Sequence, residues 1–383
     1  MAQLNRINTI KNLAVVLILI VSFFIGKSRT EFDLIPHLSE VFPDAATFEQ
    51  TDGIYSAFSE KNELLGWIGT GSASGYGGPL LVITGIDTAG TILGSKVVEH
   101  KETPIFIRIA RVADYLKSLA GTSFREAEFD YDAVVSVSGA TKTANAIEKS
   151  IKMSVTNVTG GIFNSPLPIE QKPIEFGLKE IAVVLLFVFG IAAYRAKKPL
   201  SRRLRWASQI AGLAILGFWE NSPVTLTKLT VFLSGYFPDL HSGIFWYLLI
   251  GSFVLTILLL GESTYCTHMC PFGALQRCVG VIGGAKLKLP GWAVRLSGHI
   301  RNTIVVTALA AALITVQPGS ISYEPFAAVF ALQGTLLQWV LLMIVLVLSL
   351  LYKNPWCYFL CPMRSFEKAL RKIRFSVLQV IRR

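Results

Sequence analysis

The chain has few charged residues and few cysteines for its length. Only 16% of its 383 residues are Asp, Glu, Lys or Arg, while 52% are hydrophobic, and soluble domains usually contain about 25% charged residues. This composition excludes an ordinary soluble protein and favours a membrane protein. No cysteine occurs before Cys266, so the long polar stretch that precedes it is not a disulfide scaffold.

The positive net charge does not indicate nucleic-acid binding. Lys and Arg exceed Asp and Glu by 11, but they lie beside apolar runs. Twenty-one of them fall in four segments, 1–12, 195–205, 262–301 and 353–383, whereas 220–242 and 317–325 hold only Lys228. Because basic loops stay in the cytoplasm, we expect both termini inside the cell and segment 27–175 outside the cytoplasmic (inner) membrane. Membrane lipid, not nucleic acid, is then the surrounding partner.

Apolar runs predict a bundle of about six transmembrane helices. The runs are Leu13–Ile25, Ile181–Tyr194, Trp206–Trp219, Gly243–Gly261, Thr303–Val316 and Phe326–Tyr352. A span needs about 20 residues, so the shorter runs must extend into interfacial neighbours. The first run is similar to a signal-peptide core, but Gly26-Lys27-Ser28-Arg29 offers no small-x-small cleavage pattern, which favours an uncleaved anchor.

These boundaries predict three parts. Residues 1–26 form the anchor, 27–175 an extracytoplasmic α+β domain, and 176–383 the helical membrane domain. Within the α+β domain the patterns predict a strand over Asn62–Thr70, a hairpin of Leu80–Ile86 and Thr91–Val98, and an amphipathic helix over Ala144–Ile151. On the same outer side, the loop 220–242 is expected to carry a short interfacial helix that packs under this domain.

The run Ser138-Gly139-Ala140-Thr141-Lys142-Thr143 precedes the predicted helix. Small residues leave the hydroxyl of Thr141 on a nearly bare backbone, so a large planar partner can approach it closely. A helix N-terminus also suits a phosphate. The simpler alternative is a strand-to-helix junction in which Thr141 or Thr143 caps the helix.

Two further motifs flank the predicted hairpin: Gly75-Tyr76-Gly77-Gly78-Pro79 before it and His100-Lys101-Glu102-Thr103-Pro104 after it. Alone, each is an ordinary loop feature. In this order, with Ser-Gly-Ala-Thr, they resemble the extracytoplasmic FMN-binding domains of NqrC, RnfG and NosR. The resemblance implies FMN attached covalently, through its phosphate, to Thr141 by a flavin transferase. It also implies cofactor contacts from Ser138, Gly139, Ala140, Thr143, Tyr76, Gly77, Gly78, His100, Glu102 and Thr103.

A repeated cysteine motif ends two of the apolar runs. Cys266-Thr267-His268-Met269-Cys270-Pro271 and Cys357-Tyr358-Phe359-Leu360-Cys361-Pro362 share the pattern Cys-x-x-x-Cys-Pro, with first cysteines 91 positions apart, as in a parallel internal repeat. Cysteines at i and i+4 of a helix share a face, so two motifs offer four thiolates. Four thiolates suit one [4Fe–4S] cluster, one [2Fe–2S] cluster or one tetrahedral metal.

Buried free cysteines are the alternative interpretation of these motifs. Redox chemistry favours an iron–sulfur cluster or iron over zinc, because zinc has no redox chemistry to join to a flavin. Cys278 lies outside both motifs and is expected to be structural. His268 is either a ligand or a polar residue at a helix end.

The paired motifs resemble the membrane half of the NosR and NapH iron–sulfur proteins, and the order of parts resembles NosR over almost the whole chain. Those families continue into a ferredoxin module, which we do not expect here because no such cysteine run precedes Arg383. The resemblance implies electron transfer between a cytoplasmic or quinone-side donor, such as a ferredoxin-type protein, and an extracytoplasmic redox acceptor.

Two other functions are compatible with the sequence. One is a redox-responsive regulatory or maturation component that supports an extracytoplasmic metalloenzyme such as nitrous-oxide reductase. The other is an interaction protein whose motifs bind nothing. The electron path also has a gap, since the ~30 Å bilayer core separates the two expected sites. No apolar run shows the paired histidines of a haem, so the flavin domain must dip, the cysteines must lie deep, or a quinone, flavin or partner must act as relay.

Overall fold

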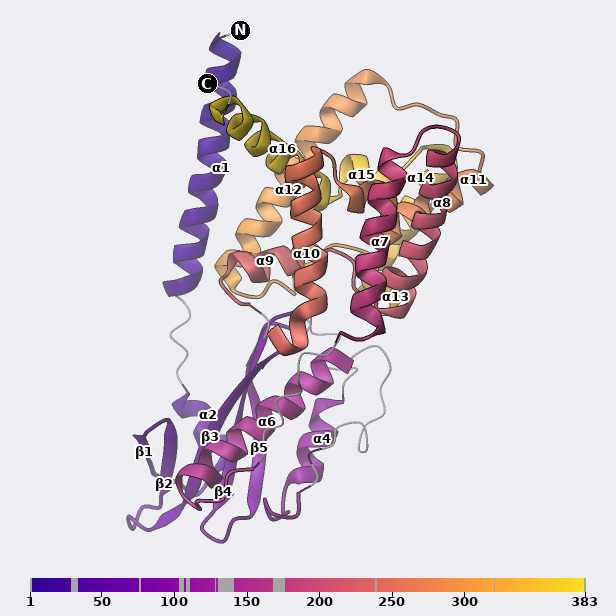
Figure 1. Cartoon of the computed structure of the whole chain (residues 1–383). Helices are drawn as coiled ribbons and strands as arrows, with labels where there is room; N and C mark the ends of the chain where they lie inside the picture. Colours follow the sequence, from indigo (N-terminus) through magenta and orange to yellow (C-terminus); the bar gives the residue numbers. More distant parts are fainter. Residues whose placement is uncertain are drawn as a thin grey trace.

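The computed structural model describes residues 2–28, 34–75, 77–102, 107, 111–127, 129, 141–167, 176–237, 240–319 and 321–381. It has two parts (Figure 1): a sheet domain at one end and a larger helical domain above it. Both chain ends lie at the end of the helical domain that is remote from the sheet (Figure 1). This arrangement agrees with the expected α+β domain on a helical bundle.

The sheet domain is built on an antiparallel meander in the order β1-β2-β3-β4-β5. Its strands are β1 (Thr47–Thr51), β2 (Ile54–Phe58), β3 (Leu64–Ser74), β4 (Pro79–Asp87) and β5 (Ile92–His100). In the β4–β5 turn, Asp87 Oδ1 accepts the N–H groups of Ala89 and Thr91 at 2.9 and 2.7 Å, and Gly90 takes a φ of +89°. The predicted hairpin is therefore confirmed.

Helix α6 (Thr141–Gly161) lies across the sheet, and α2 (Ile35–Val41) and α4 (Val112–Leu119) complete the domain (Figure 1). Glycines allow the close packing of α6, because a Cβ at Gly69 or Gly71 would overlap the carbonyl oxygens of Ser154 or Ser150. The helix continues well past Ile151, where the sequence pattern placed its end. Its later Ser and Thr hydroxyls bond back to helix carbonyls, which lets polar residues remain helical.

The helical domain contains both long helices and short ones. In chain order they are α1 (Ala2–Ser28), α7 (Leu178–Arg195), α8 (Leu200–Gly212) with its π-helical continuation η1 (Leu213–Trp219), α9 (Leu226–Leu233), α10 (Leu240–Leu260), η2 (Tyr265–Met269), α11 (Pro271–Ile282), α12 (Gly291–Thr315), α13 (Phe326–Phe330), α14 (Leu336–Leu351), α15 (Pro355–Phe359) and α16 (Pro362–Ile381). Helix α1 packs on α12 so closely that a Cβ at Gly26 would overlap the carbonyl oxygen of Leu313.

Within the described residues, two helices are long and apolar enough to cross a membrane, at Gly243–Leu260 and Gly291–Thr315. Asn12–Ser28 and Leu336–Leu351 are shorter apolar helices. The chain therefore has the apolar helices of a membrane-associated protein, while the expected count of six spans stays a prediction.

One expectation about the helical domain is wrong. The apolar run 326–352 is not one helix: Thr335 and Gln338 form a capping box that starts α14, so the short α13 is separate. In the loop 220–242 the expected short helix is present as α9, and every residue from Ser222 to Val231 is buried, Lys228 included. In each half of the repeat a short helix, α9 or α13, precedes the longer helix that leads to the cysteine motif.

Candidate functional site

Each cysteine motif consists of one helical turn followed by a proline that begins the next helix. The N–H of Cys270 donates to Tyr265 O at 2.7 Å, and the N–H of Cys361 donates to Trp356 O at 2.9 Å. Pro271 and Pro362 then start α11 and α16, where the missing N–H costs no helix hydrogen bond. The repeat is thus one of conformation as well as of sequence.

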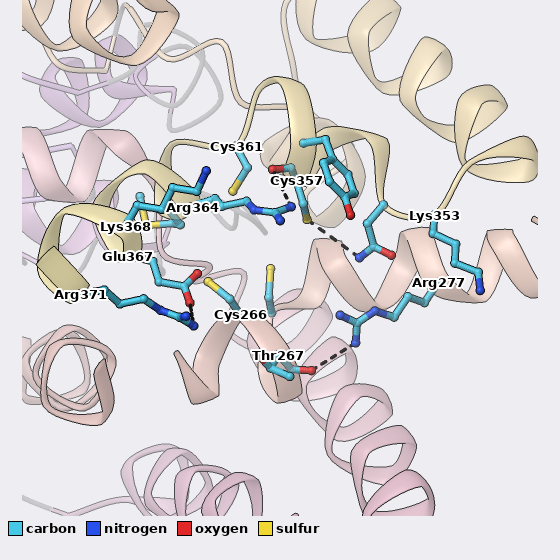
Figure 2. Close-up of a pocket in the computed structure, with 14 residues that line it drawn as sticks. Cys266, Thr267, Arg277, Lys353, Cys357, Cys361, Arg364, Glu367, Lys368 and Arg371 are labelled. Atoms are coloured by element: carbon cyan, nitrogen blue, oxygen red, sulfur yellow. Dashed lines mark hydrogen bonds and ion pairs between the residues drawn. The ribbon is translucent and has the colours of Figure 1, made fainter. Parts of the chain in front are cut away.

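All four motif cysteines line one cavity of about 430 Å³. Figure 2 shows the sulfurs of Cys266, Cys357 and Cys361 turned toward this shared space. The helix-face argument for their meeting was wrong in detail: Cys270 has left the helix, with φ −57° and ψ 115°. Two tight turns, both on the wall of this cavity, bring the sulfurs to one space instead.

The number and type of these side chains suit a metal or cluster with sulfur ligands. Metal–sulfur bonds of about 2.3 Å hold the sulfurs of one tetrahedral ion about 3.8 Å apart. Across the described residues, no group of three or more His, Cys, Asp or Glu side chains is arranged to hold one metal ion. Four thiolates on one cavity suit an iron–sulfur cluster.

The cavity is electropositive, which suits an anionic cluster. Its lining includes five cationic side chains, from Arg277, Lys353, Arg364, Lys368 and Arg371. The single carboxylate in the lining, Glu367, accepts from Arg371 at 2.6 Å. Burial and the neighbouring Cys357 raise the pKa of the Cys270 thiol to about 12, so cluster binding must displace a proton from it.

The helices that follow the motifs brace them crosswise. Gln276, on α11 after the first motif, is 1% exposed and its Oε1 accepts the N–H of Trp356 at 3.0 Å. Its Nε2 lies 3.9 Å from Cys357 Sγ. Glu367, the matching residue on α16, accepts the N–H of Ser263 at 3.4 Å. Each half of the repeat therefore fixes the cysteine turn of the other half.

We expect Gln276→Glu to weaken iron retention about 10- to 100-fold, the range typical of residues that hold metal ligands. The change removes the amide donor to Cys357 and adds a negative charge beside the thiolates. The measurement is iron per protein after a timed challenge with a chelator. Gln338→Glu is the matched control, because glutamate can keep the capping box of α14. Equal iron retention in the two variants would contradict the role of Gln276 in holding the second cysteine turn.

Two polar residues near the first motif lie outside the cavity. His268 is 1% exposed and packs beside Gly190 of α7, and it is absent from the cavity lining. Burial, with Arg205 and Arg277 nearby, lowers the pKa of His268 to about 4, so it is a neutral interior side chain. Cys278 on α11 is also not in the lining, in keeping with the structural role expected for it.

The second candidate site lies at the end of the sheet domain that faces the helical domain. Gly75 and Gly77 approach the chain at Lys101 and Glu102: a Cβ on Gly75 would overlap Glu102 Oε1, and one on Gly77 would lie 2.6 Å from Lys101 O. Two motifs far apart in sequence thus form one surface. Nearby, Ser150 of α6 donates to Leu80 O at 3.4 Å.

Thr141 begins α6 at this same end. At about 1.5 Å per residue, the nine residues from Ser150 back to Thr141 carry the helix start roughly 13 Å past the first residues of β4. The side chain of Thr141 is not described, and Tyr76, Thr103 and the run Ser138 to Ala140 lie outside the described residues. The start of α6 therefore lies beyond the first residues of β4, and the attachment of FMN to Thr141 stays a prediction.

Buried polar atoms at this end fit a polar ligand such as FMN. Thr143 is 1% exposed, and neither its Oγ1 nor His100 Nδ1 has a hydrogen-bond partner among the described residues. Burial lowers the pKa of His100, so its imidazole is neutral at neutral pH. Such atoms are costly to bury unless something satisfies them, and a bound cofactor is a suitable partner.

Side chains of the sheet domain and of the helical domain pack against one another. Lys101 Nζ lies 5.0 Å from the ring centroid of Tyr236, just after α9. Ala327 of α13 packs against the sheet-domain core. The adjacent Phe326 lies 5.2 Å from Phe272, whose ring is 5.6 Å from Trp356 beside Cys357. Of the explanations for the gap in the path, the structure favours a flavin domain docked on the helices.

Comparison with known proteins identifies two domains. An FMN-binding domain matches residues 75–156, the region of the glycine turn, the β4–β5 hairpin and the start of α6. A 4Fe-4S binding domain matches residues 242–290 and 335–377, so both of its segments contain a cysteine motif. FMN and an iron–sulfur cluster are thus the cofactors of the chain.

Individual relatives show the same two resemblances. The chain is 25% identical over 217 residues to protein NirI of Paracoccus denitrificans, covering 49% of this chain and 31% of NirI. It is 26% identical over 213 residues to regulatory protein NosR of Pseudomonas aeruginosa, covering 50% of this chain and 29% of NosR. Over 105 residues it is 35% identical to a subunit of the ion-translocating oxidoreductase complex of Vibrio vulnificus, covering 24% of this chain and 50% of that protein.

The chain matches at most half the length of these three relatives, so the similarity is one of domains. The similarity to the oxidoreductase complex and the FMN-binding match support a flavin domain, and the NirI and NosR similarities extend over about half of the chain. The sheet with its glycine cradle and the paired cysteine turns account for these matches in structural terms. Taken together, the chain carries an FMN-binding domain and a 4Fe-4S binding domain, and about half of it is similar to part of NosR.

Proposed function

We propose that the protein transfers electrons across the cytoplasmic membrane, between a cytoplasmic or quinone-side donor and an extracytoplasmic acceptor. The observation that carries this proposal is the continuous packing from the flavin end of the sheet domain, through Tyr236 and α13, to the cysteine cavity. Two redox sites in one packed unit are suited to electron exchange, whereas separate binding modules have no need of such contact.

The proposed site residues follow from this assignment. Cys266, Cys270, Cys357 and Cys361 hold the cluster, and Thr141 carries FMN with His100, Glu102, Thr143 and the glycine turn around it. When bound, FMN exchanges one or two electrons and the cluster exchanges single electrons. The protein residues position both groups and supply the positive charge around the thiolates.

The partners follow from the same arrangement. A flavin transferase attaches FMN, a ferredoxin-type protein or a quinone supplies electrons, and an extracytoplasmic redox protein accepts them. The cationic cavity lining suits an acidic electron carrier. A spectrum of the purified chain is the first test, because bound flavin and cluster give a coloured protein that dithionite bleaches; a colourless protein from flavinylating, iron-replete cells would contradict the proposal.

A regulatory role is the second candidate, favoured by the similarity to regulatory protein NosR. In that role the protein responds to redox state and supports an extracytoplasmic metalloenzyme such as nitrous-oxide reductase. The two candidates differ in what the purified protein does by itself. Electron transfer by the isolated protein supports the first function, and loss only of a partner enzyme's activity in cells supports the second.

The proposed topology has six spans, both termini in the cytoplasm, and the domain boundaries 1–26, 27–175 and 176–383. We expect a Ser59→Cys variant to react with an impermeant thiol reagent in intact cells, because Ser59 lies in the sheet domain after β2. A Lys288→Cys variant, in the exposed loop between α11 and α12, should react only after permeabilisation. The measurement is the extent of labelling with and without permeabilisation. Wild-type protein, labelled in the same way, gives the background signal of the native cysteines. Reversed labelling would invert the topology.

A further inference from the structure

Besides His268 and Arg301, two ionisable side chains are buried in the helical domain outside the lining of the cysteine cavity. Lys228 on α9 is 5% exposed, and Glu324, just before α13, is 2% exposed. Neither lines the cavity. Ionisable side chains are rarely buried unless they are paired, because burial disfavours their charged form. These two lie where the short helices of the repeat begin, between the flavin end and the cluster end of the protein.

Glu324 points at the first turn of α9. Its Oε2 accepts the N–H of Leu226 at 2.8 Å, taking one of the N–H groups that a helix start leaves free. Its Oε1 has no hydrogen-bond partner among the described residues. The hydroxyl of Thr225, the N-cap, is used by the N–H of Lys228 at 3.2 Å. Oε2 of Glu324 is therefore fixed by a hydrogen bond, and Oε1 is the oxygen that can bind a proton.

The surroundings of Glu324 contain few other charges. On α9, Lys228 Nζ donates to Ser222 Oγ at 3.0 Å and to Pro223 O at 2.9 Å. Tyr323 precedes Glu324, and Tyr265 on η2 accepts the N–H of Val224 through its hydroxyl at 2.9 Å. Around Leu226, the packed side chains of α12, α1 and α16 are apolar: Val305, Leu309, Leu313, Leu19, Phe23 and Phe366. The positive charge of Arg301 on α12 interacts electrostatically with Tyr323.

These surroundings pull the carboxyl in opposite directions. Burial favours the neutral acid, while the Leu226 N–H and the Lys228 charge favour the carboxylate. Burial prevails and raises the pKa of Glu324 to about 8, against the lowering effect of Leu226 and Lys228. A carboxyl balanced in this way can gain or lose a proton near neutral pH after a small change in the local charge.

Tyr323 connects this carboxyl to the cysteine motif. Its hydroxyl donates to Leu360 O at 2.8 Å, the residue before Cys361, and its ring lies 5.9 Å from Trp356, the residue before Cys357. In an interior of low dielectric, an added negative charge is strongly disfavoured unless a positive charge accompanies it. A proton bound within the same packed unit provides that positive charge.

We propose that Glu324 is a proton-binding site coupled to the cysteine site. When that site gains one electron from its one-electron donor, Glu324 takes one proton from water, so the carboxyl O–H bond forms and the interior charge is unchanged. Reoxidation breaks that bond and returns the proton. The coupling rests on the proposed electron-transfer function, whereas proton binding by Glu324 does not require it.

Proton binding is tested by an infrared pH titration of the purified full chain. We expect the carbonyl band of a protonated carboxyl to disappear as pH rises through the range around about 8, and to be missing at all pH values in Glu324→Gln. Glu220→Gln is the matched control, since Glu220 pairs with Lys179 at 3.5 Å at the same end of the domain, and it should keep the band. A band unaffected by Glu324→Gln would overturn the proposal.

Coupling is tested by anaerobic redox titration of the iron signal at several pH values. In wild type the midpoint potential should fall by about 59 mV for each tenfold fall in proton concentration over part of this range, and in Glu324→Gln it should be nearly constant. Equal slopes in the two proteins would overturn the coupling. A chain without any iron signal would defeat the proposed function, and the infrared titration would still decide whether Glu324 binds a proton.

Discussion

Replacing Cys266 with serine should reduce bound iron to background and abolish the visible absorbance of the cluster. Replacing Cys361, in the other motif, should have the same effect on the same signal, because all four motif cysteines line one cavity and a cluster left with three thiolates is open to water and oxidation. The flavin should remain on Thr141 in both variants, since the sheet domain has its own core. Iron analysis and low-temperature electron paramagnetic resonance measure the outcome.

Cys278→Ser is the control that the chain itself provides. This residue has the same chemistry and lies on α11, close in sequence to the first motif, but it does not line the cavity, so its replacement should leave iron unchanged. Two independent signals, each lost with only one motif, would mean two sites with further ligands. Stoichiometric zinc without iron would contradict the prediction. The cysteine site would then be a structural metal site in a protein whose redox cofactor is the flavin alone.

Thr141→Ala should abolish covalent flavin when the protein is produced with a flavin transferase. Thr141 is the first residue of α6, and its hydroxyl is the proposed attachment point. Fluorescence of the protein band on a denaturing gel under ultraviolet light should be present in wild type and absent in the variant. Iron should be retained, because the cysteine cavity is formed entirely by the helical domain.

Thr143→Ala is the matched control for attachment. Thr143 is 1% exposed, so a transferase has no access to its hydroxyl and covalent fluorescence should persist. Loss of the unsatisfied Oγ1 should instead change the flavin absorbance of the folded protein. Fluorescence that survives in Thr141→Ala would move the attachment to another residue, and wild-type protein that never binds flavin would sink the assignment of this domain.

Much of the sheet domain could be predicted because its signals are local. The β4–β5 hairpin follows from a four-residue turn with Gly90 at positive φ, and the glycine motif and its partner loop meet because they bracket that hairpin. The strands β1 and β2 were missed, since Thr47–Thr51 is short and polar and is held by pairing rather than by its own pattern. The extension of α6 beyond Ile151 depends likewise on packing against Gly69 and Gly71.

The interior of the helical domain was less predictable, because its key contacts join residues distant in sequence. The repeated spacing predicted one site made of four cysteines. It did not identify Gln276, which accepts the N–H of Trp356 from the other half of the repeat. Lys228 was interpreted as the single basic residue of an outer loop, yet α9 carries it into the interior, where Ser222 and Pro223 accept its hydrogens. Glu324 carried no sequence signal beyond being an acid before a proline.

The central claim is most directly tested in vesicles that contain the purified, flavinylated, iron-loaded protein. Ferricyanide is enclosed and dithionite is added outside, so that neither charged reagent crosses the bilayer and reduction of ferricyanide requires electron passage through the protein. We predict that wild-type vesicles reduce the enclosed ferricyanide, and that Thr141→Ala and Cys266→Ser vesicles do so only at the rate of protein-free vesicles. Wild-type vesicles that reduce ferricyanide no faster than protein-free ones, or variants as fast as wild type, would contradict transmembrane electron transfer through these two sites.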